Sequence, residues 1–436
     1  MFDITKSKTT DYQSPFSTVG AIFIGISVPL VASSPTVMAI SALLGFIFIF
    51  LSPGRKDLLR LMLSRALKPL ALVIICLFLA WLPAVFDSID IEKSLSVWAR
   101  MLAFLIIAST FYSFLLGSYL RRKSALCGLI TASTISSLVG LIAIYFYSPI
   151  LSLYRLENLE VINAAQTLKY YGSAEGCLSI VILWAGFKLG GIWRPVALLK
   201  ALFGIILIVS VDSDSGLLAF IIGMACSIFV MLESKIISKR ITGVSVLLFS
   251  ILSLIALSII LAYLPSTPDL SNHKSTIFDG LLSPNISTDI LDVHRQHIWA
   301  FSLNEALKSP MIGYGIDISN YLPGAQVVAT QFNQAFIPGH PHSWFIEVFL
   351  ETGAIGLFFL IFSLLVLLWC WHKIGIKDPL LASVGISLFG AFWVSSMINF
   401  SIWSSWWQGV FLILTAILLA FSSTEIQNQQ KMPLRK

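Results

Sequence analysis

Charged side chains are scarce in this chain of 436 residues: Asp, Glu, Lys and Arg make up 11% of it, whereas 57% of the residues are hydrophobic. The mean hydropathy is +0.88. A typical soluble domain has about 25% charged residues, so the composition excludes an ordinary soluble protein. Apolar runs of about 17–25 residues, the length that crosses a bilayer, recur along the whole chain. The sequence therefore predicts an all-α, multi-pass integral membrane protein in contact with membrane lipids.

Several other signals are missing. No cleavable signal peptide is evident, because the first apolar run is followed at once by a second. No Gly-x-x-x-x-Gly-Lys-Ser/Thr stretch occurs, so we expect no nucleotide ligand. The net charge of +6 does not indicate nucleic-acid binding, because the basic residues lie between apolar runs. No disulfide framework or cysteine metal site is expected, because every cysteine lies in or beside an apolar run: Cys76, Cys127, Cys177, Cys226 and Cys370.

The apolar runs predict twelve membrane spans. One long polar stretch interrupts them, so we divide the chain into spans one to nine within 1–264, an outer loop at 265–344, spans ten to twelve within 345–423, and a cytoplasmic tail at 424–436. The predicted spans are 17–33, 36–52, 69–86, 98–117, 125–147, 174–190, 195–211, 216–232, 242–264, 345–371, 380–399 and 406–423.

The distribution of basic residues predicts that both termini are cytoplasmic, since Lys and Arg beside spans are retained on that side. With this orientation seven basic residues fall outside, and Lys200 lies within a span. Most of the others fall on inside links: Lys6, Lys8, Arg55, Lys56, Arg60, Arg65, Lys68, Arg121, Arg122, Lys123, Lys188, Arg194, Lys235, Lys239, Arg240, Lys373, Lys377, Lys431, Arg435 and Lys436.

The densest group of reactive side chains lies where the outer loop meets span ten. His340-Pro341-His342-Ser343 precedes a helix that we expect to start near Ser343, since Pro341 cannot lie inside it. Ser343, Glu347 and Glu351 recur every four residues and share one helical face. Interfacial anchoring would explain a lone histidine. Two imidazoles beside stacked carboxylates favour a functional site.

A second group, around Arg295, predicts an amphipathic helix that lies on the membrane, because Trp299, Leu303 and Leu307 are spaced four apart. Arg295 is the candidate for function, since a guanidinium can bind a phosphate through two hydrogen bonds. A solvated salt bridge to Asp292 is the structural alternative. The Gly313-Tyr314-Gly315 that follows lacks the flanking residues of a potassium filter, which excludes that class of channel.

Two further interpretations stay open. His294-x-x-His297 and His340-x-His342 have a spacing that would allow four nitrogen ligands for zinc, without being diagnostic. In the outer loop at 148–173, Arg155 and Lys169 lie beside aromatic residues. That loop could bind a sugar phosphate or could form part of an ordinary interfacial belt.

The spacing after His342 resembles a known pattern. His342-Ser343, nine residues, Gly353, two residues and Gly356 is similar to the motif of bacterial O-antigen ligases. In that motif His is followed by Asn, Ser or Gln, nine residues, Gly, two residues, and Gly, Thr or Tyr. The two glycines would let backbones approach closely.

The upstream sequence is similar to the same superfamily, which includes O-antigen polymerases and protein O-oligosaccharyltransferases. Arg295-x-x-x-Trp299 and Pro310-x-x-Gly313-x-Gly315 match the segment that precedes the histidine motif in its members. The twelve spans and the long loop agree as well, so the resemblance covers most of the chain. It implies a GT-C-like helical fold in the inner membrane of a bacterium, with the active site facing the periplasm.

The resemblance implies metal-independent glycan transfer from undecaprenyl diphosphate to lipid A–core oligosaccharide, without a cofactor. An imidazole with a pKa near 6.5 suits the deprotonation of a sugar hydroxyl, so His342 is the expected base. Arg295 would hold the diphosphate, and direct attack on an α-linked donor would invert the anomeric centre. His340, Tyr314 and Glu347 are the expected residues for orienting the base or the acceptor.

One departure from the family and three alternatives accompany this hypothesis. Many members carry Ser-Arg-Gly before span eight, whereas this chain has Asp214-Ser215-Gly216, so Arg155 or Lys169 would have to supply the cation. A polymerase would use the same donor with a lipid-linked acceptor, and a protein O-oligosaccharyltransferase would use a protein. A transporter of lipid-linked sugars is the alternative of another class, although its polar residues would be expected near the membrane midplane.

Overall fold

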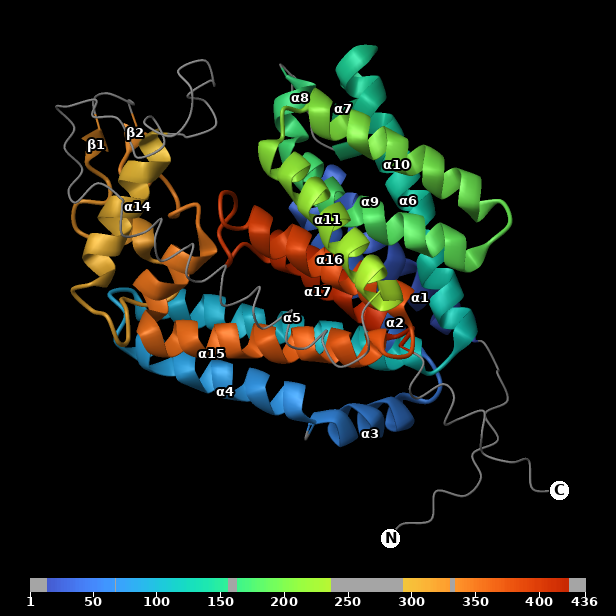
Figure 1. Ribbon diagram of the computed structural model, residues 1–436, viewed down its shortest axis with the longest axis horizontal. Coiled ribbons are helices and arrows are strands. Elements are labelled where there is room, and N and C mark those ends of the chain that lie inside the picture. The colour runs from blue at the N-terminus through green and yellow to red at the C-terminus, as the bar shows by residue number, and fades with distance from the viewer. Residues whose placement is uncertain (1–13, 67, 156–162, 237–292, 330–333, 423–436) are drawn as a thin grey trace, which may run out of the picture. The chain divides into compact units, whose positions relative to one another are not determined.

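The computed structural model describes residues 14–66, 68–155, 163–236, 293–329 and 334–422 (Figure 1). The chain forms two compact units, one made of residues 1–66, 104–224 and 409–436 and the other of 67–103 and 225–408. Three helices contribute to both units: α5 (Ile91–Leu116), α11 (Asp214–Ile236) and α17 (Ser405–Leu419).

Each unit has its own set of elements besides these three helices. The first unit contains α1 (Pro15–Ser27), η1 (Pro29–Ala32), α2 (Pro35–Leu51), α3 (Arg55–Ala66), α6 (Tyr119–Tyr145), α7 (Pro149–Arg155), α8 (Ala164–Thr167), α9 (Lys169–Leu189) and α10 (Trp193–Ser210). The second contains α4 (Pro69–Phe86), α14 (Val293–Ala306), η3 (Ser319–Tyr321), β1 (Val328–Ala329), β2 (Gln334–Ala335), α15 (Trp344–Gly375) and α16 (Pro379–Ser395).

The helices confirm the predicted class, an all-α multi-pass membrane protein. Every predicted span within the described residues coincides with an apolar helix. Seven described helices are long and apolar enough to cross a membrane, and α2 with α3 would make eight if that bent pair is one span. Helices α1, α16 and α17 are apolar but shorter. The ninth predicted span, 242–264, lies outside the described residues, so the count of twelve stays a prediction.

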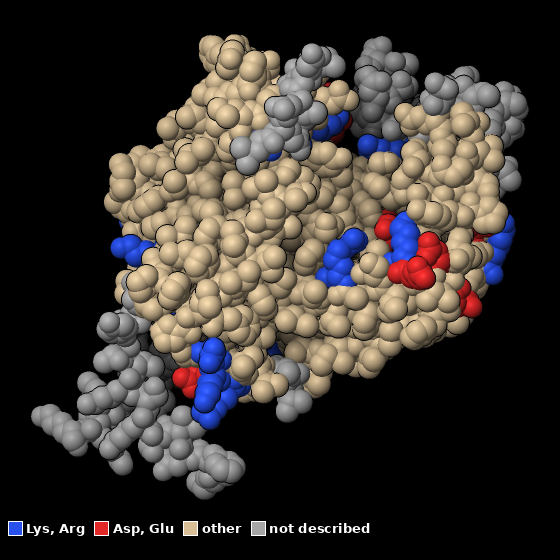
Figure 2. Space-filling view, turned by 180° about the vertical axis from the view of Figure 1, so that it is seen from behind, with Lys and Arg blue, Asp and Glu red and all other residues tan. Residues whose placement is uncertain are grey.

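The surface has the composition that a lipid environment requires. Large apolar side chains are exposed on several helices, among them Leu63 at 70% and Val209 at 66%. Figure 2 shows a face on which charged side chains form only isolated patches among uncharged residues. Extended apolar surfaces of this kind mark contact with a membrane or a partner rather than with water.

Two local elements lie outside the predicted spans. Helix α3 forms between the spans predicted at 36–52 and 69–86, and it is bent by 110° from α2. Its leucines and its basic residues alternate at helical spacing, which makes the segment amphipathic. A short antiparallel pair, β1 with β2, lies within the loop predicted at 265–344.

In the first unit, glycines allow close helix packing. Helix α1 packs against α6, and a Cβ at Gly25 would overlap the carbonyl group of Ala125. Lys200, which lies within a predicted span, forms a fully buried ion pair with Glu175 of α9. Ser137 also donates a hydrogen bond of 2.8 Å to Glu175. Buried charges are tolerated in membrane helices when they are paired in this way.

In the second unit, α15 packs against α4, α14 and α16, and it is broken at Gly353. Gly353 has φ 64° and ψ −172°, which a helix cannot contain. Such a break exposes peptide groups that need other hydrogen-bond partners, at a high cost inside a membrane. The segment 310–315 supplies those partners.

The hydrogen bonds between the two segments run in both directions. Backbone N–H groups of Tyr314 and Gly315 donate to the carbonyls of Leu350 and Glu351, at 3.2 and 2.9 Å. In return, the N–H of Ala354 donates to the carbonyl of Pro310 at 2.8 Å.

The backbones approach this closely because both segments, 310–315 and α15, have a glycine at the contact. A Cβ at Gly353 would overlap the Met311 backbone, and a Cβ at Gly313 would overlap that of Glu351. Gly353 and Gly313 belong to two separate sequence motifs. This one contact explains why each motif has a glycine at that position.

Gly353→Ala is predicted to destabilise the protein strongly. Alanine costs about 1–3 kcal/mol in this backbone conformation, which is populated almost only by glycine, and overlap with Met311 adds about 1–3 kcal/mol. Gly54→Ala is the matched control, because Gly54 also has positive φ (91°) but a Cβ added there would meet no atom within 4 Å. Thermal unfolding in detergent should show a much larger loss for Gly353→Ala, and equal losses would contradict the packing role.

Candidate functional site

The site is built around a tight turn that contains His340 and His342, directly before α15. His342 has a left-handed backbone, with φ 56°, and the centroids of the two rings lie 4.1 Å apart. The backbone N–H of His342 donates to Nδ1 of His340 at 3.1 Å. A nitrogen that accepts this bond carries no proton, so the ring of His340 is neutral in this arrangement.

The hydrogen bond of His342 indicates the tautomer of its ring. Nδ1 of His342 lies 3.1 Å from the backbone carbonyl oxygen of Asn399. A carbonyl oxygen only accepts, so Nδ1 carries the proton and the lone pair of the neutral ring is on Nε2. His342 thus has the form that a general base needs, with its ring held from the side opposite to the basic nitrogen.

Helix α14 brings Arg295 to the histidine turn. Nε1 of Trp299 donates to the carbonyl of Pro341 at 2.9 Å, which joins the helix to the turn. Arg295 lies one helical turn before Trp299 and is half-buried. Burial, the proximity of His342 and the positive charge of Arg295 lower the pKa of His340 from 6.5 to about 3. The structure therefore brings together His340, His342 and Arg295.

Glu347 connects α15 with the loop between α16 and α17, here called the 396–404 loop. Its carboxylate is fully buried and accepts hydrogen bonds from Ser401 Oγ at 2.6 Å and from the N–H of Ile402 at 2.9 Å. The backbone N–H of Trp344 donates to the carbonyl of Ser396 at 3.0 Å. Through these contacts Glu347 holds the 396–404 loop against the start of α15. Its contact with a substrate stays a prediction.

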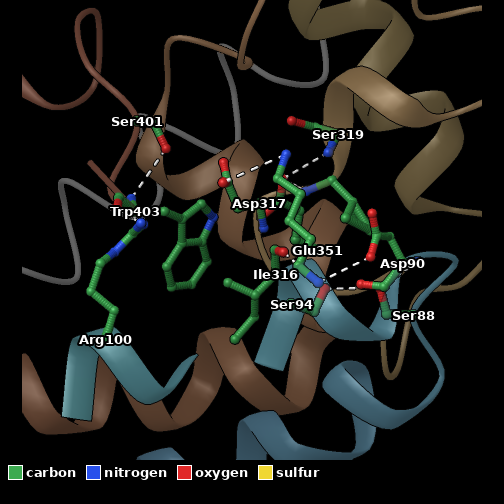
Figure 3. Close-up of polar contacts among 12 residues, drawn as sticks. Ser88, Asp90, Ser94, Arg100, Ile316, Asp317, Ser319, Glu351, Ser401 and Trp403 are labelled. Carbon is green, nitrogen blue, oxygen red and sulfur yellow. Dashed lines mark hydrogen bonds and ion pairs between the residues drawn. The ribbon is translucent and has the colours of Figure 1, made fainter. Parts of the chain in front are cut away.

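Glu351 organises the segment after the Gly313-x-Gly315 motif. It is fully buried, and its carboxylate accepts from three successive N–H groups, those of Asp317, Ile318 and Ser319, at 2.6, 3.1 and 2.9 Å (Figure 3). The three donors satisfy a carboxylate that would be costly to bury alone. Residues 317–319 are thereby held against the helix that follows His342.

Asp317 contacts the N-terminal end of α5. Nζ of Lys93 lies 3.6 Å from its carboxylate, and Lys93 also lies 4.1 Å from the centroid of the Tyr321 ring. Burial raises the pKa of Asp317, and the positive charges of Lys93 and Arg100 oppose that rise. Ser94 Oγ donates to the carbonyl of Ile316 at 2.9 Å. Figure 3 shows Ser94, Ile316 and Asp317 near Glu351.

Tyr314 belongs to the small apolar core of the outer loop. It packs, with Trp299, Phe301 and Phe349, against buried residues that include Ile298 and Leu350. Its hydroxyl donates to the carbonyl of Glu305 at 3.3 Å, and partial burial raises the pKa of this phenol. Its predicted contact with the substrate stays a prediction.

The other two predicted binding residues lie in the first unit. Arg155 ends α7 and is half-buried, and Lys169 begins α9 and is exposed. Asp214-Ser215-Gly216, the stretch without arginine, begins α11. A substrate-binding role for Arg155 or Lys169 stays a prediction.

The zinc interpretation depends on residues that are only partly described. Residues 265–292 lie outside the described residues, with Asp292, the alternative partner of Arg295, among them, and so does the side chain of His294. Within the described part of the chain, no group of three or more His, Cys, Asp or Glu side chains is arranged to bind a metal ion.

Sequence reasoning missed three contributors to this region: the 396–404 loop, Asp317 and Arg100. The loop overlaps the end of the predicted span 380–399, because α16 ends at Ser395, and it carries no motif. Asp317 follows the Gly313-x-Gly315 motif, and this proximity was a usable signal. Arg100 lies two residues inside the predicted span 98–117, and a charge in that position is itself a signal of function.

Comparison with known proteins agrees with the motif. The family model of O-antigen ligases matches residues 199–361, a stretch that includes α14, the histidine turn and the first half of α15. A protein of Rickettsia typhi named "Putative polysaccharide ligase" is 27% identical over 222 residues, which is 50% of this chain and 50% of the relative.

A second relative with that name, from Rickettsia conorii, is 26% identical over 148 residues, which is 33% of this chain and 36% of the relative. The matched stretches thus span half or less of the length of these relatives. The match to the family model includes the residues that carry the resemblance found in the sequence. These matches show that the chain is similar to O-antigen ligases over residues 199–361, which is less than half of its length.

Proposed function

We propose that this protein transfers a glycan from undecaprenyl diphosphate to the lipid A–core oligosaccharide. The single observation that carries the proposal is the His342 ring, whose Nδ1 is bound to the carbonyl of Asn399 and which leaves Nε2 as the basic nitrogen. The ring lies directly before α15, a helix long and apolar enough to span a membrane, and the charge of Arg295 acts on the adjacent His340. A lipid-linked diphosphate has its reactive carbon at the membrane surface, where such a site can reach it. The family match supports the same class of reaction.

In the proposed reaction, Nε2 of His342 takes the proton of the acceptor hydroxyl. The oxygen attacks the anomeric carbon, a new glycosidic bond forms, and the bond between that carbon and the diphosphate oxygen breaks. The electron pair leaves with undecaprenyl diphosphate, and the guanidinium of Arg295 stabilises the added negative charge. Attack from the side opposite to the leaving group inverts the anomeric centre, and residues of the chain account for each step without a metal ion.

The proposal includes a place in the cell. The basic residues on the predicted inside links support cytoplasmic termini. With that orientation in a bacterial inner membrane, the histidine turn would face the periplasm. The site then faces the leaflet in which a lipid-linked donor and a lipid A–core acceptor can meet. A polymerase of the same superfamily would differ in its acceptor, so the identity of the acceptor decides between the two activities.

His342→Ala is predicted to abolish transfer, with a loss of at least about 10²-fold in kcat, because it removes the general base. His372→Ala is the matched control, because His372 lies in the last turn of the same helix, beside Trp369. Glycan on lipid A–core can be read from gels after reaction with the purified variants. Normal transfer by His342→Ala, with the control also normal, would contradict the assignment of the base.

The depressed pKa of His340 predicts a pH effect on stability. The folded pKa of about 3 is below the ordinary 6.5, so folding favours the neutral ring. This contribution to stability is complete above pH 6.5 and is lost as the pH falls from 6.5 towards 3. His340→Asn retains an acceptor for the N–H of His342 but cannot titrate.

The acid unfolding of His340→Asn should therefore begin at a lower pH than that of the wild type. Tryptophan fluorescence of the protein in detergent can follow the transition. His372→Asn serves as the control and should unfold like the wild type. Identical transitions for wild type and His340→Asn would show that His340 is not held neutral by the fold.

A further inference from the structure

Arg100 is a cation in the apolar helix α5. It is exposed, and one Nη donates to the backbone carbonyl of Trp403 at 3.1 Å (Figure 3). In the described part of the chain, no carboxylate forms an ion pair with its guanidinium. A guanidinium has five N–H donors, so most of its capacity to bind an anion remains.

The surroundings of Arg100 are those of a membrane interface. Nε1 of Trp98, two residues before Arg100, donates to the carbonyl of Phe78 at 3.0 Å. Trp81 packs edge-on against Trp403, with ring centroids 5.3 Å apart. Tryptophans gather at the level of the lipid headgroups, which is where the phosphates of a lipid-linked donor lie.

The 396–404 loop connects Arg100 with the proposed base. Within this loop, Asn399 binds Nδ1 of His342, and the carbonyl of Trp403 accepts from Arg100. Between them, Ser401 and Ile402 bind Glu347. One short loop thus holds the histidine ring and the arginine, which both belong to the second unit.

The nearby carboxylates do not require Arg100 as their partner. Glu347 is bound by the 396–404 loop, and Glu351 by three backbone N–H groups. Asp317 has Lys93 at 3.6 Å as its ion-pair partner, and the charge of Arg100 acts on Asp317 without forming an ion pair with it. The guanidinium of Arg100 therefore retains N–H donors for a ligand.

A diphosphate needs more positive charge than one residue supplies. It carries two negative charges while bonded to the glycan and gains a further one when the glycan leaves, whereas Arg295 contributes a single positive charge. We propose that Arg100 binds the diphosphate of the lipid-linked donor, as a second cation beside Arg295. This inference rests on the proposed function, since it concerns the donor of the same reaction.

The test measures the binding of undecaprenyl diphosphate and of undecaprenyl monophosphate to the purified full-length protein in detergent. Arg100→Gln removes the charge but retains an N–H donor for the carbonyl of Trp403, so the loop keeps its contact. Arg100→Lys retains the charge without the planar donor group. Arg60→Gln is the control, because the side chain of Arg60 is 82% exposed in α3, in the other unit.

We expect Arg100→Gln to weaken diphosphate binding at least about tenfold, as for a lost charge-assisted hydrogen bond. Binding of the monophosphate should weaken less, Arg100→Lys should lie between wild type and Arg100→Gln, and Arg60→Gln should bind normally. In the transfer reaction, Arg100→Gln should raise the KM for the donor more than it lowers kcat. The thermal midpoint of the ligand-free protein should not change.

Two results would overturn this inference while leaving the proposed function intact. One is normal diphosphate binding by Arg100→Gln in a protein whose wild type binds and transfers, which would make Arg100 an interfacial anchor. The other is an equal loss of binding in the Gln and Lys variants together with a lower thermal midpoint, which would indicate a structural role. Failure of the wild type to bind undecaprenyl diphosphate would instead overturn the proposed function, and this inference with it.

Discussion

The break of α15 at Gly353 is the constraint on which the rest of the second unit depends. A membrane helix that stops and resumes leaves peptide groups without partners, and here the segment 310–315 provides them through paired backbone hydrogen bonds. That pairing puts residues 317–319 where Glu351 can accept three of their N–H groups. The glycine motifs thus have a structural role, because they fix the position of the segment that lies beside the start of α15.

The 396–404 loop is the second scaffold of the site. It has no charged side chain, yet its backbone and hydroxyl groups hold His342, Glu347 and Arg100. Its contact with His342 also determines which ring nitrogen is basic. A loop of this kind can orient a base without competing for the proton, because a peptide carbonyl does not titrate in the range in which an imidazole does.

The elements that the sequence predicted best are those with a strong local signal. Long apolar runs predicted the helices, and the Pro341 and Ser343 pattern predicted the start of α15, which begins at Trp344. The interruption at Gly353 could not be predicted in the same way, because a glycine in an apolar helix is compatible with a straight span. The partners of Glu351 and the link from Asn399 to His342 join segments far apart in the chain, and no local pattern encodes them. Arg295 and His342 were paired through family resemblance, and the fold provides the physical connection through Trp299 and Pro341.

The most direct test of the proposed reaction uses the purified wild-type protein in detergent with an undecaprenyl-diphosphate-linked glycan and EDTA. Lipid A–core is added to one tube and withheld from the other. We expect glycan on lipid A–core in the first tube and unchanged donor in the second. Longer lipid-linked glycans in both tubes would make the protein a polymerase. No transfer with EDTA, restored by zinc, would contradict chemistry carried by His342 and Arg295 alone.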